Sequence, residues 1–543
     1  MTNAASSPVR DPWHAANARG WRVIDASLQD GDVDLETDVV IVGSGAGGGT
    51  AAEILTQAGL SVVLIEEGPL KTSTDFRMRE SDAYPALYQE SAARKTKDKA
   101  INIFQGRCVG GGTTVNWTSS FRTPEVTLAY WQRAFGLAGY SAAAMAPWFA
   151  RMEARLAIAP WDVAPNANNE TLARGAAGIG IPTAAIRRNV KGCWNLGYCG
   201  MGCPTNAKQS MLVTTIPGAL DRGATLVTRA RALEFVHQRE RVTALRCAGM
   251  DSDGVYTTAR RLTVRARAYI AAAGAIGTPA LLLRSRVPDP HAVVGKRTFL
   301  HPTVVSAAAM PTLIAPYSGA PQTIYSDHYL DTLPFDGPIG YKLEAPPVHP
   351  ILMAITLPSQ GMDHARWMRE LPRLHVEIAL LRDGFHPDSP GGTVTIDNDG
   401  APVLDYPLTP YVWDGVRRAF RTMAEIQFAA GATSVMPIHD KGAAYTRWAD
   451  ARAAIDGLEL SPRVTPVMSA HVMGGCAFGP DPRRAAVDPQ GRYHHLSNLY
   501  VLDGSLFPTS IGANPQLSIY ALTARLADGI AGGLVPARPR TRD

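Results

Sequence analysis

The residues from Gly43 to Gly48 have the types and spacing needed to hold a cofactor that contains phosphates. They read Gly-Ser-Gly-Ala-Gly-Gly, which is the pattern G-x-G-x-x-G, and they follow a β-branched run at residues 38–42. In this setting Gly43 permits a tight turn, Gly45 lets a pyrophosphate approach the backbone, and Gly48 lets the next helix pack closely on the strand. Glu66 follows Gly43 by 23 residues, where an acidic side chain accepts hydrogen bonds from a ribose diol. The chemistry indicated is dinucleotide binding.

Three cysteines form a second cluster whose spacing could do chemistry. Cys193, Cys199 and Cys203 are arranged as C-x5-C-x3-C, and Pro204 follows them. Three thiolates so close together in a long chain favour soft-metal ligation over disulfide bonding. A tight loop rich in Gly and Cys, without any metal, is the alternative. The other three cysteines are far apart in the sequence and are expected to be small buried apolar residues, namely Cys108, Cys247 and Cys476.

A second glycine-dense segment runs from Gly106 to Asn116. A backbone rich in glycine can come very close to a ligand or to another strand. Read together with the first segment and the C-terminal region, it resembles the glucose-methanol-choline oxidoreductase family. The likeness extends from about Asp38 to Ile530, with further matches at residues 269–279 and 501–508. Four separate motifs in the family's order make this resemblance specific.

The resemblance implies that FAD is the cofactor and assigns residues to each part of it. The ADP half would be held by the first glycine segment and its acid, the pyrophosphate and flavin by the second glycine segment, and the pyrophosphate or ribityl chain by a late strand end. The residues are Gly43, Gly45, Gly48 and Glu66; Gly110, Gly111 and Asn116; and Asp503 and Gly504. For Asn116 and Asp503 a role as turn residues that satisfy their own backbone remains open.

The same resemblance singles out one of the 13 histidines. Removing hydride from a carbinol carbon requires that the hydroxyl proton leave as well, and histidine is the residue type suited to accept it near neutral pH. In the family the base opens a glycine-containing motif, which here is His471 to Cys476, and its partner falls on Asn514. The separation of 43 residues matches the family. We expect His471 to take the proton and Asn514 to donate a hydrogen bond to the developing alkoxide.

The electron acceptor is left open by two conflicting resemblances. The cysteine spacing resembles that of family dehydrogenases with a three-iron four-sulfur cluster, which would pass electrons to a redox protein. Lys208-Gln209-Ser210 and Val115-Asn116-Trp117 instead resemble the long-chain alcohol oxidases, which would pass electrons to oxygen. A second function class is also open, because flavin-containing hydroxynitrile lyases share the family fold without net redox chemistry.

The elements that must position these residues predict an α/β fold. The first glycine segment lies between two buried strands, with a helix over residues 50–58, which makes a βαβ unit. With the resemblance, this implies a doubly wound Rossmann-type FAD-binding domain assembled from residues 37–120, 205–310 and 462–536. Residues 121–204 and 311–461 would form an inserted α+β substrate domain built on an antiparallel sheet. Strands are expected there at 375–381 and 392–397, and a helix at 412–430.

Composition limits the partners. A net charge of +5 over 543 residues is too small to indicate a nucleic-acid surface. No N-terminal secretory pattern and no apolar run long enough to span a bilayer are visible, so we expect a cytoplasmic protein. The substrate is expected to be a small-molecule alcohol. Apolar residues of the inserted region favour a lipophilic or aromatic one, although core packing would explain them equally: Ile351, Leu352, Met353, Ile355, Leu357 and Trp367.

Overall fold

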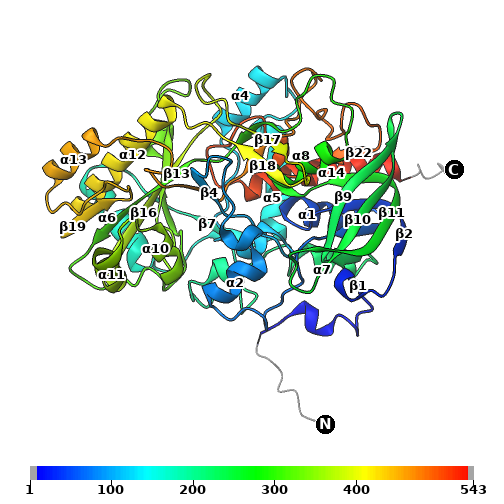
Figure 1. Ribbon diagram of the computed structural model, residues 1–543, viewed down its shortest axis with the longest axis horizontal. Helices are drawn as coiled ribbons and strands as arrows, with labels where there is room; N and C mark the ends of the chain where they lie inside the picture. The colour runs from blue at the N-terminus through cyan, green and yellow to red at the C-terminus, as the bar shows by residue number, and fades with distance from the viewer. Residues whose placement is uncertain (1–8, 536–543) are drawn as a thin grey trace, which may run out of the picture.

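The computed structural model describes residues 9–535, so residue 536, the last of the predicted FAD-binding domain, lies outside it. Two large sheets lie toward opposite ends of the longest axis (Figure 1). The predicted βαβ unit is present as β2 (Val33–Val42), α1 (Ala46–Gln57) and β3 (Val62–Ile65). β2 and β3 pair in parallel, with Val42 opposite Ile65. The helix begins earlier than predicted, inside the glycine-rich segment itself.

The first sheet is built around this unit. Within residues 9–535 its order is β1-β8-β3-β2-β11-β10-β9, and β22 also pairs with β11. Strands β1, β8, β3, β2, β11 and β22 run parallel, and β10 and β9 add an antiparallel edge. The further strands are β1 (Arg22–Asp25), β8 (Thr225–Thr228), β9 (Ala230–Gln238), β10 (Arg241–Met250), β11 (Thr257–Ala271) and β22 (Leu499–Val501).

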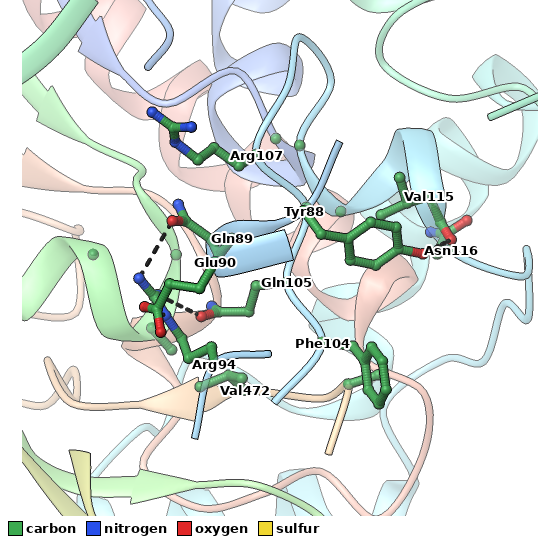
Figure 2. Close-up of a pocket in the computed structure, with 18 of the residues that line it drawn as sticks. Tyr88, Gln89, Glu90, Arg94, Phe104, Gln105, Arg107, Val115, Asn116 and Val472 are labelled. Atoms are coloured by element: carbon green, nitrogen blue, oxygen red, sulfur yellow. Dashed lines mark hydrogen bonds and ion pairs between the residues drawn. The ribbon is translucent and has the colours of Figure 1, made fainter. Parts of the chain in front are cut away.

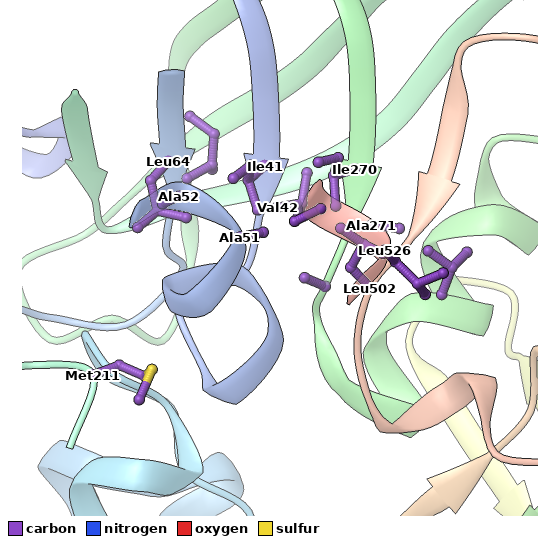
Figure 3. Close-up of a cluster of buried hydrophobic side chains, with 14 of the residues drawn as sticks. Ile41, Val42, Ala51, Ala52, Leu64, Met211, Ile270, Ala271, Leu502 and Leu526 are labelled. Carbon is purple, nitrogen blue, oxygen red and sulfur yellow. The ribbon is translucent and has the colours of Figure 1, made fainter. Parts of the chain in front are cut away.

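The core of this half packs helix α1 between the sheet and the C-terminal helix α14 (Gln516–Leu534). Figure 3 shows small residues of α1, Ala51 and Ala52, beside Ile41 and Leu64 of the strands, with Leu526 of α14 in the same cluster. All five side chains are buried. Alanine on α1 allows the close packing of helix on strand that the glycine motif requires. The strand ends that face the cofactor motifs are therefore held by a continuous apolar core.

The second large sheet has the order β4-β20-β13-β16-β15-β14-β6, and β19 also pairs with β13. It is antiparallel apart from the parallel pair β20 and β4. Helices α12 (Pro410–Ala429) and α6 (Ala167–Gly178) pack with it. Its strands are β4 (Ile101–Ile103), β6 (Ala184–Ala185), β13 (Thr303–Ala309), β14 (Ile324–Ser326), β15 (Tyr341–Glu344), β16 (Leu374–Leu381), β19 (Ser434–Pro437) and β20 (Val467–Ser469).

These two sheets confirm the predicted fold class. The strand expected at 375–381 is β16 and the helix expected at 412–430 is α12, within two residues at each end. The strand expected at 392–397 is β17 (Gly392–Ile396), but its placement in the sheet of β16 is wrong. It pairs instead with β12 (Lys296–Phe299) and β18 (Pro402–Asp405) in a separate small sheet. Alternation of residue types predicts a strand, but pairing partners are decided by long-range contacts.

None of the helices within residues 9–535 is both long enough and apolar enough to span a bilayer.

Candidate active site

A cavity of about 1040 Å³ lies between the glycine-rich segments and the second large sheet. This volume is at the upper end of ordinary ligand sites, which run from roughly 300 to 1,000 Å³. Most of the residues predicted to bind FAD line it, together with both residues predicted to carry the chemistry. They are Gly43, Gly45, Glu66, Gly111, Asn116, Asp503, Gly504, His471 and Asn514. Gly48 and Gly110 are absent from its lining.

The first glycine turn leaves room for a phosphate where the sequence predicts one. A Cβ on Gly45 would have only Gly111 Cα, 3.9 Å away, as a neighbour within 4 Å, and Gly45 precedes the first residue of α1. Gly43 adopts φ +98°, and a Cβ there would lie 2.2 Å from Ala272 O. A Cβ on Gly48 would lie 1.8 Å from Gly43 O. Gly45 therefore borders open space at a helix N-terminus, while Gly43 and Gly48 shape the backbone.

Glu66 is more closely engaged with the protein than the sequence indicates. Its Oε2 accepts hydrogen bonds from Ser44 N at 3.1 Å and Ser44 Oγ at 2.6 Å, and its Oε1 accepts one from Gly68 N at 2.8 Å. Burial raises the pKa of this carboxyl group, and the three donors oppose that effect. Glu66 thus braces the glycine turn. It also lines the cavity, and a carboxylate has lone pairs left for a ribose.

The second glycine segment forms the facing wall. In Figure 2, Val115 and Asn116 lie near Tyr88, while Arg94 is held by Gln89 and Gln105 elsewhere in the same cavity. Asn116 Nδ2 donates to Gln516 Oε1 at 2.7 Å, at the start of α14. Asn116 therefore ties the second glycine segment to the helix that follows Asn514.

Asp503 serves its neighbours as an acceptor. Its Oδ2 accepts from Gly274 N at 2.8 Å and from Thr278 Oγ1 at 2.6 Å, and its Oδ1 accepts from Ser505 N at 2.8 Å. Burial raises the pKa of the Asp503 carboxyl group. The side chain joins the end of the β22 segment to helix α8 (Gly274–Arg284) while it borders the cavity.

His471 lies in the loop after β20, where Ser469 Oγ accepts a hydrogen bond from its backbone N at 3.3 Å. It is partly buried and lines the cavity. Desolvation, together with the charge of Lys342, lowers the pKa of His471 to about 4. The ring is therefore neutral at physiological pH, which is the form able to accept a proton.

His301 connects the two segments predicted to carry the chemistry. Gly512 N donates to His301 Nε2 at 3.1 Å, and His301 Nδ1 lies 3.3 Å from His471 Nδ1. Burial, with His471 as a lesser cause, lowers the pKa of His301 well below its ordinary value, so the ring is neutral. Because Nε2 accepts, the hydrogen of His301 must be on Nδ1 and is donated to His471. The neutral His471 then carries its own hydrogen on Nε2.

Asn514 lies two residues after Gly512 and is 4 % exposed. Its Nδ2 donates to Oε2 of Glu344, the last residue of β15, at 3.3 Å. Desolvation raises the pKa of the Glu344 carboxyl group to about 7, against the lowering effects of Lys342 and of the Asn514 hydrogen bond. A buried ionisable group thus adjoins the predicted partner of the base.

The raised pKa of Glu344 leads to a prediction about the pH dependence of stability. The folded Glu344 holds its proton up to about pH 7, whereas the unfolded chain releases it near pH 4.3, so stability is lost as pH rises between these values. The Glu344→Gln variant has no ionisable group at this position, so it does not lose stability in this way as the pH rises. We expect its unfolding free energy relative to the wild type to improve by roughly 2 to 3 kcal/mol from pH 5 to pH 8, at 1.36 kcal/mol per pKa unit. Urea titration at both pH values measures it; a difference independent of pH contradicts it.

The three clustered cysteines do not form the predicted metal site. All are free thiols of intermediate exposure. Cys199 Sγ accepts from Arg188 Nη2 at 3.9 Å, and Cys193 Sγ accepts from Asn195 N at 3.4 Å. Within residues 9–535 no three His, Cys, Asp or Glu side chains are arranged to hold a metal ion. The structure therefore does not support the iron–sulfur cluster, because spacing along a loop does not make its sulfur atoms converge.

The far wall of the cavity is apolar. Alternate residues of β16, namely Val376, Ile378 and Leu380, face it, as does Val305 of β13. Of the apolar residues noted in the sequence, Leu352 and Met353 line the cavity. Leu357 is buried, Trp367 packs against the adjoining apolar cluster, and Ile351 and Ile355 are 40 % and 60 % exposed.

Sequence reasoning missed two groups at this site. They are His301 and Glu344. A His-Pro pair and a strand-end glutamate are common features, and neither lies near His471 or Asn514 in the sequence. Only the pairing of β15 with β16 and the path of the 510–516 loop bring them into contact with the residues that line the cavity.

Comparison with known proteins shows which family the chain is similar to. Family profiles described as GMC oxidoreductase match residues 84–303 and 387–523, and one described as FAD binding domain matches residues 38–78. The long-chain-alcohol oxidase FAO1 of Arabidopsis thaliana is 26% identical, over 91% of this chain and 67% of its own length. A GMC-type oxidoreductase of Mycobacterium tuberculosis is 30% identical, over 92% of this chain and 77% of its own length.

Solved structures show the same fold. Formate oxidase from Aspergillus oryzae superposes with a TM-score of 0.66 at 15% identity, covering 93% of this chain and 99% of its own. Pyridoxine 4-oxidase gives a TM-score of 0.63 at 18% identity, covering 91% of this chain and 98% of its own. The fold, the glycine-lined cavity and the matched sequence lead to one conclusion: this chain is an FAD-dependent oxidoreductase that belongs to the GMC oxidoreductase family.

Proposed function

We propose that the protein oxidises a lipophilic or aromatic primary or secondary alcohol to the carbonyl compound, with FAD as hydride acceptor. The single observation that carries this is the composition of one cavity. His471 and Asn514 border it together with the glycine segments, and the apolar faces of β13 and β16 form its far wall. An alcohol bound there would place its hydroxyl group near the polar residues and its hydrocarbon against the strands.

His471 is proposed to take the hydroxyl proton. In the arrangement described above, its Nε2 carries the hydrogen, so accepting a proton at Nε2 first requires that hydrogen to leave and Nδ1 to become protonated. That exchange ends the hydrogen bond from His301. The distance of 3.3 Å marks a weak bond, and a typical hydrogen bond contributes only about 0.5 to 1.5 kcal/mol net. The exchange also leaves the Nδ1–H groups of the two rings facing each other, at a cost of about 1 to 3 kcal/mol for an unsatisfied buried donor, and the hydrogen bond that the substrate hydroxyl donates to Nε2 offsets part of this cost.

Asn514 is proposed to stabilise the oxygen as its charge grows. One amide N–H is donated to Glu344, and the second remains available to a substrate oxygen. The residue also lies at the N-terminal end of α14, a helix of 19 residues. The positive end of a helix dipole favours negative charge nearby. Asn514 and α14 would therefore act on the same developing alkoxide.

The electron acceptor is proposed to be oxygen. The relatives described above include proteins named as long-chain-alcohol oxidases, and the cysteine loop of this chain offers no arranged metal site among the described residues. Oxygen would then enter the cavity and accept the electrons of the reduced flavin there, without a redox partner protein.

Anaerobic flavin bleaching tests this function. We expect 1-dodecanol to bleach the flavin absorbance of the purified protein, and admission of air to restore it with consumption of oxygen. Burial of each methylene contributes about 0.8 kcal/mol. The rate of reduction at low substrate concentration should therefore be at least about 10²-fold higher for 1-dodecanol than for ethanol.

Two controls make the result decisive. Glucose, which is polar, should reduce the flavin poorly at the same concentration. If no alcohol of a broad panel bleaches the flavin, the protein is no alcohol oxidase, and the lyase alternative, which needs no net flavin reduction, gains support. If reduction occurs but air does not restore the absorbance, oxygen is not the acceptor.

A further inference from the structure

Glu344 is a buried carboxyl group that the proposed mechanism leaves without a role. It ends strand β15, shows no exposed surface, and accepts a hydrogen bond from Asn514 Nδ2. Two amide groups donate to the same oxygen, Oε2: Gln322 Nε2 at 2.5 Å and Asn514 Nδ2 at 3.3 Å. Glu344 therefore touches the cavity only through the amides that it holds.

The orientation of these amides is set by a chain of hydrogen bonds. Ser119 Oγ donates to Gln322 Oε1 at 2.9 Å, so Gln322 must present its nitrogen to Glu344. The carboxylate is acceptor-only, so Asn514 must present its nitrogen too. Asn514 therefore directs Nδ2 to Glu344 and not Oδ1. That oxygen is buried and has no hydrogen-bond partner.

Glu344 Oε1 is likewise buried and without a hydrogen-bond partner. A carboxyl group that served only to fill space would be destabilising here, because burying an unsatisfied polar atom is costly and an apolar side chain would avoid that penalty. We therefore infer that the carboxyl group of Glu344 is retained because it orients the amides of Gln322 and Asn514.

We propose that Glu344 is a positioning residue, whose carboxylate accepts one N–H of the Asn514 amide and so fixes the amide with the second N–H of Nδ2 available to the substrate oxygen. This rests on the proposed function, in which Asn514 donates to that oxygen. Loss of the carboxylate would let the amide turn over. Asn514 would then present a carbonyl oxygen, which repels an alkoxide, in place of an N–H.

The charged and titratable groups around Glu344 come from several elements. Lys342 lies on the same strand, and its Nζ pairs with Asp327 Oδ1 at 2.7 Å. Tyr325 of β14 is paired with Glu344 in the sheet, and burial raises the pKa of its hydroxyl group. The positive charge of Lys342 contributes to the lowered pKa of both His471 and His301. Because the pKa of His471 is lowered to about 4, a titration near pH 7 is better assigned to Glu344.

The test is stopped-flow reduction of the flavin by 1-dodecanol in holoprotein variants. Glu344→Gln should slow reduction by about 10- to 10²-fold, the order expected when a reacting group is misplaced, with a smaller change in the alcohol concentration at half-maximal rate. In the Asn514→Ala background the same change should have little further effect, since its target is gone. The wild-type rate should rise with pH through about 7, and Glu344→Gln should lack that inflection.

Glu377→Gln is the matched control. Glu377 is also a fully buried glutamate of the second sheet with a raised pKa, but its carboxyl group bonds to His375. It should leave the rate unchanged. The Glu344→Asp variant keeps a carboxyl group, so its rate should keep the pH inflection. This second variant keeps the proposal testable if the Glu344→Gln protein misfolds.

The outcomes separate the two proposals. If Asn514→Ala reduces the flavin at the wild-type rate, the proposed role of Asn514 fails, and the role of Glu344 fails with it. If Asn514→Ala is slow but Glu344→Gln is not, or if the two losses add fully, Asn514 keeps its role and only the positioning role of Glu344 is overturned.

Discussion

Replacement of His471 by alanine is expected to slow anaerobic flavin reduction by at least about 10²-fold, the usual contribution of a positioned general base. The variant should retain FAD, because the ring hydrogen-bonds only to His301 among the contacts described. Asn514→Ala should lose less, since it leaves the base in place and removes only one hydrogen bond to a growing charge. The double variant should lose less than the sum, because both residues act on one oxygen.

Stopped-flow spectroscopy at saturating 1-dodecanol measures these rates. His291→Ala is a suitable control, because His291 is exposed and does not line the cavity, and it should reduce as the wild type does. A His471→Ala protein that carries FAD and is reduced at the wild-type rate would eliminate the mechanism. Loss of FAD in that variant would instead show that His471 supports the cofactor site.

A pair of glycine substitutions at the cofactor turn should separate folding from cofactor binding. A Cβ on Gly47 would lie 1.8 Å from Leu502 O and 3.0 Å from Asp503 Cα. These are backbone atoms beside β22, which cannot retreat without breaking its parallel pairing with β11. Gly47→Val should therefore yield no stably folded holoprotein.

Gly45→Val should behave differently. The space around its Cβ is open apart from Gly111 Cα at 3.9 Å, so the fold should persist. The added side chain would occupy the approach of the pyrophosphate to the N-terminus of α1. FAD affinity should fall by more than about tenfold, which is a loss of 1.4 kcal/mol.

Circular dichroism and the ratio of flavin to protein absorbance distinguish the two variants. Wild-type FAD content in Gly45→Val would contradict the assignment of this turn to the pyrophosphate. A folded, yellow Gly47→Val protein would show that the packing of α1 against the Leu502 segment is more adaptable than its distances indicate.

Local features of this chain were predictable because the sequence carries them within short windows. The β-branched run before Gly43, the glycine spacing and Glu66 predict a strand, a turn, a helix and a strand, and all are present. Alternation along residues 375–381 predicts β16, with Val376, Ile378 and Leu380 on one face. Backbone sterics and the period of burial determine these elements, and both act over a few residues.

The glycine motif also predicted FAD, which the match to an FAD-binding family profile supports, but it did not show how its acid is used. Glu66 was expected to serve a ribose, whereas in the structure it first holds Ser44 and Gly68. The Cys193, Cys199 and Cys203 spacing likewise indicated metal binding, and the loop conformation does not bring their sulfur atoms together. A motif fixes residue type and order, but not the direction in which a side chain points.

The sequence alone therefore determined the family, the α/β class, the FAD turn and the candidacy of His471 and Asn514. Only the tertiary structure decided that His301 contacts His471 across 170 residues and that Glu344 holds Asn514 across another 170. It also decided that β17 pairs with β12 in a separate sheet and not with the strands of the β16 sheet. The physical reason is that a hydrogen bond or a buried charge depends on distances within a few ångströms, which chain separation does not encode, whereas helices, strands and turns follow from neighbouring residues.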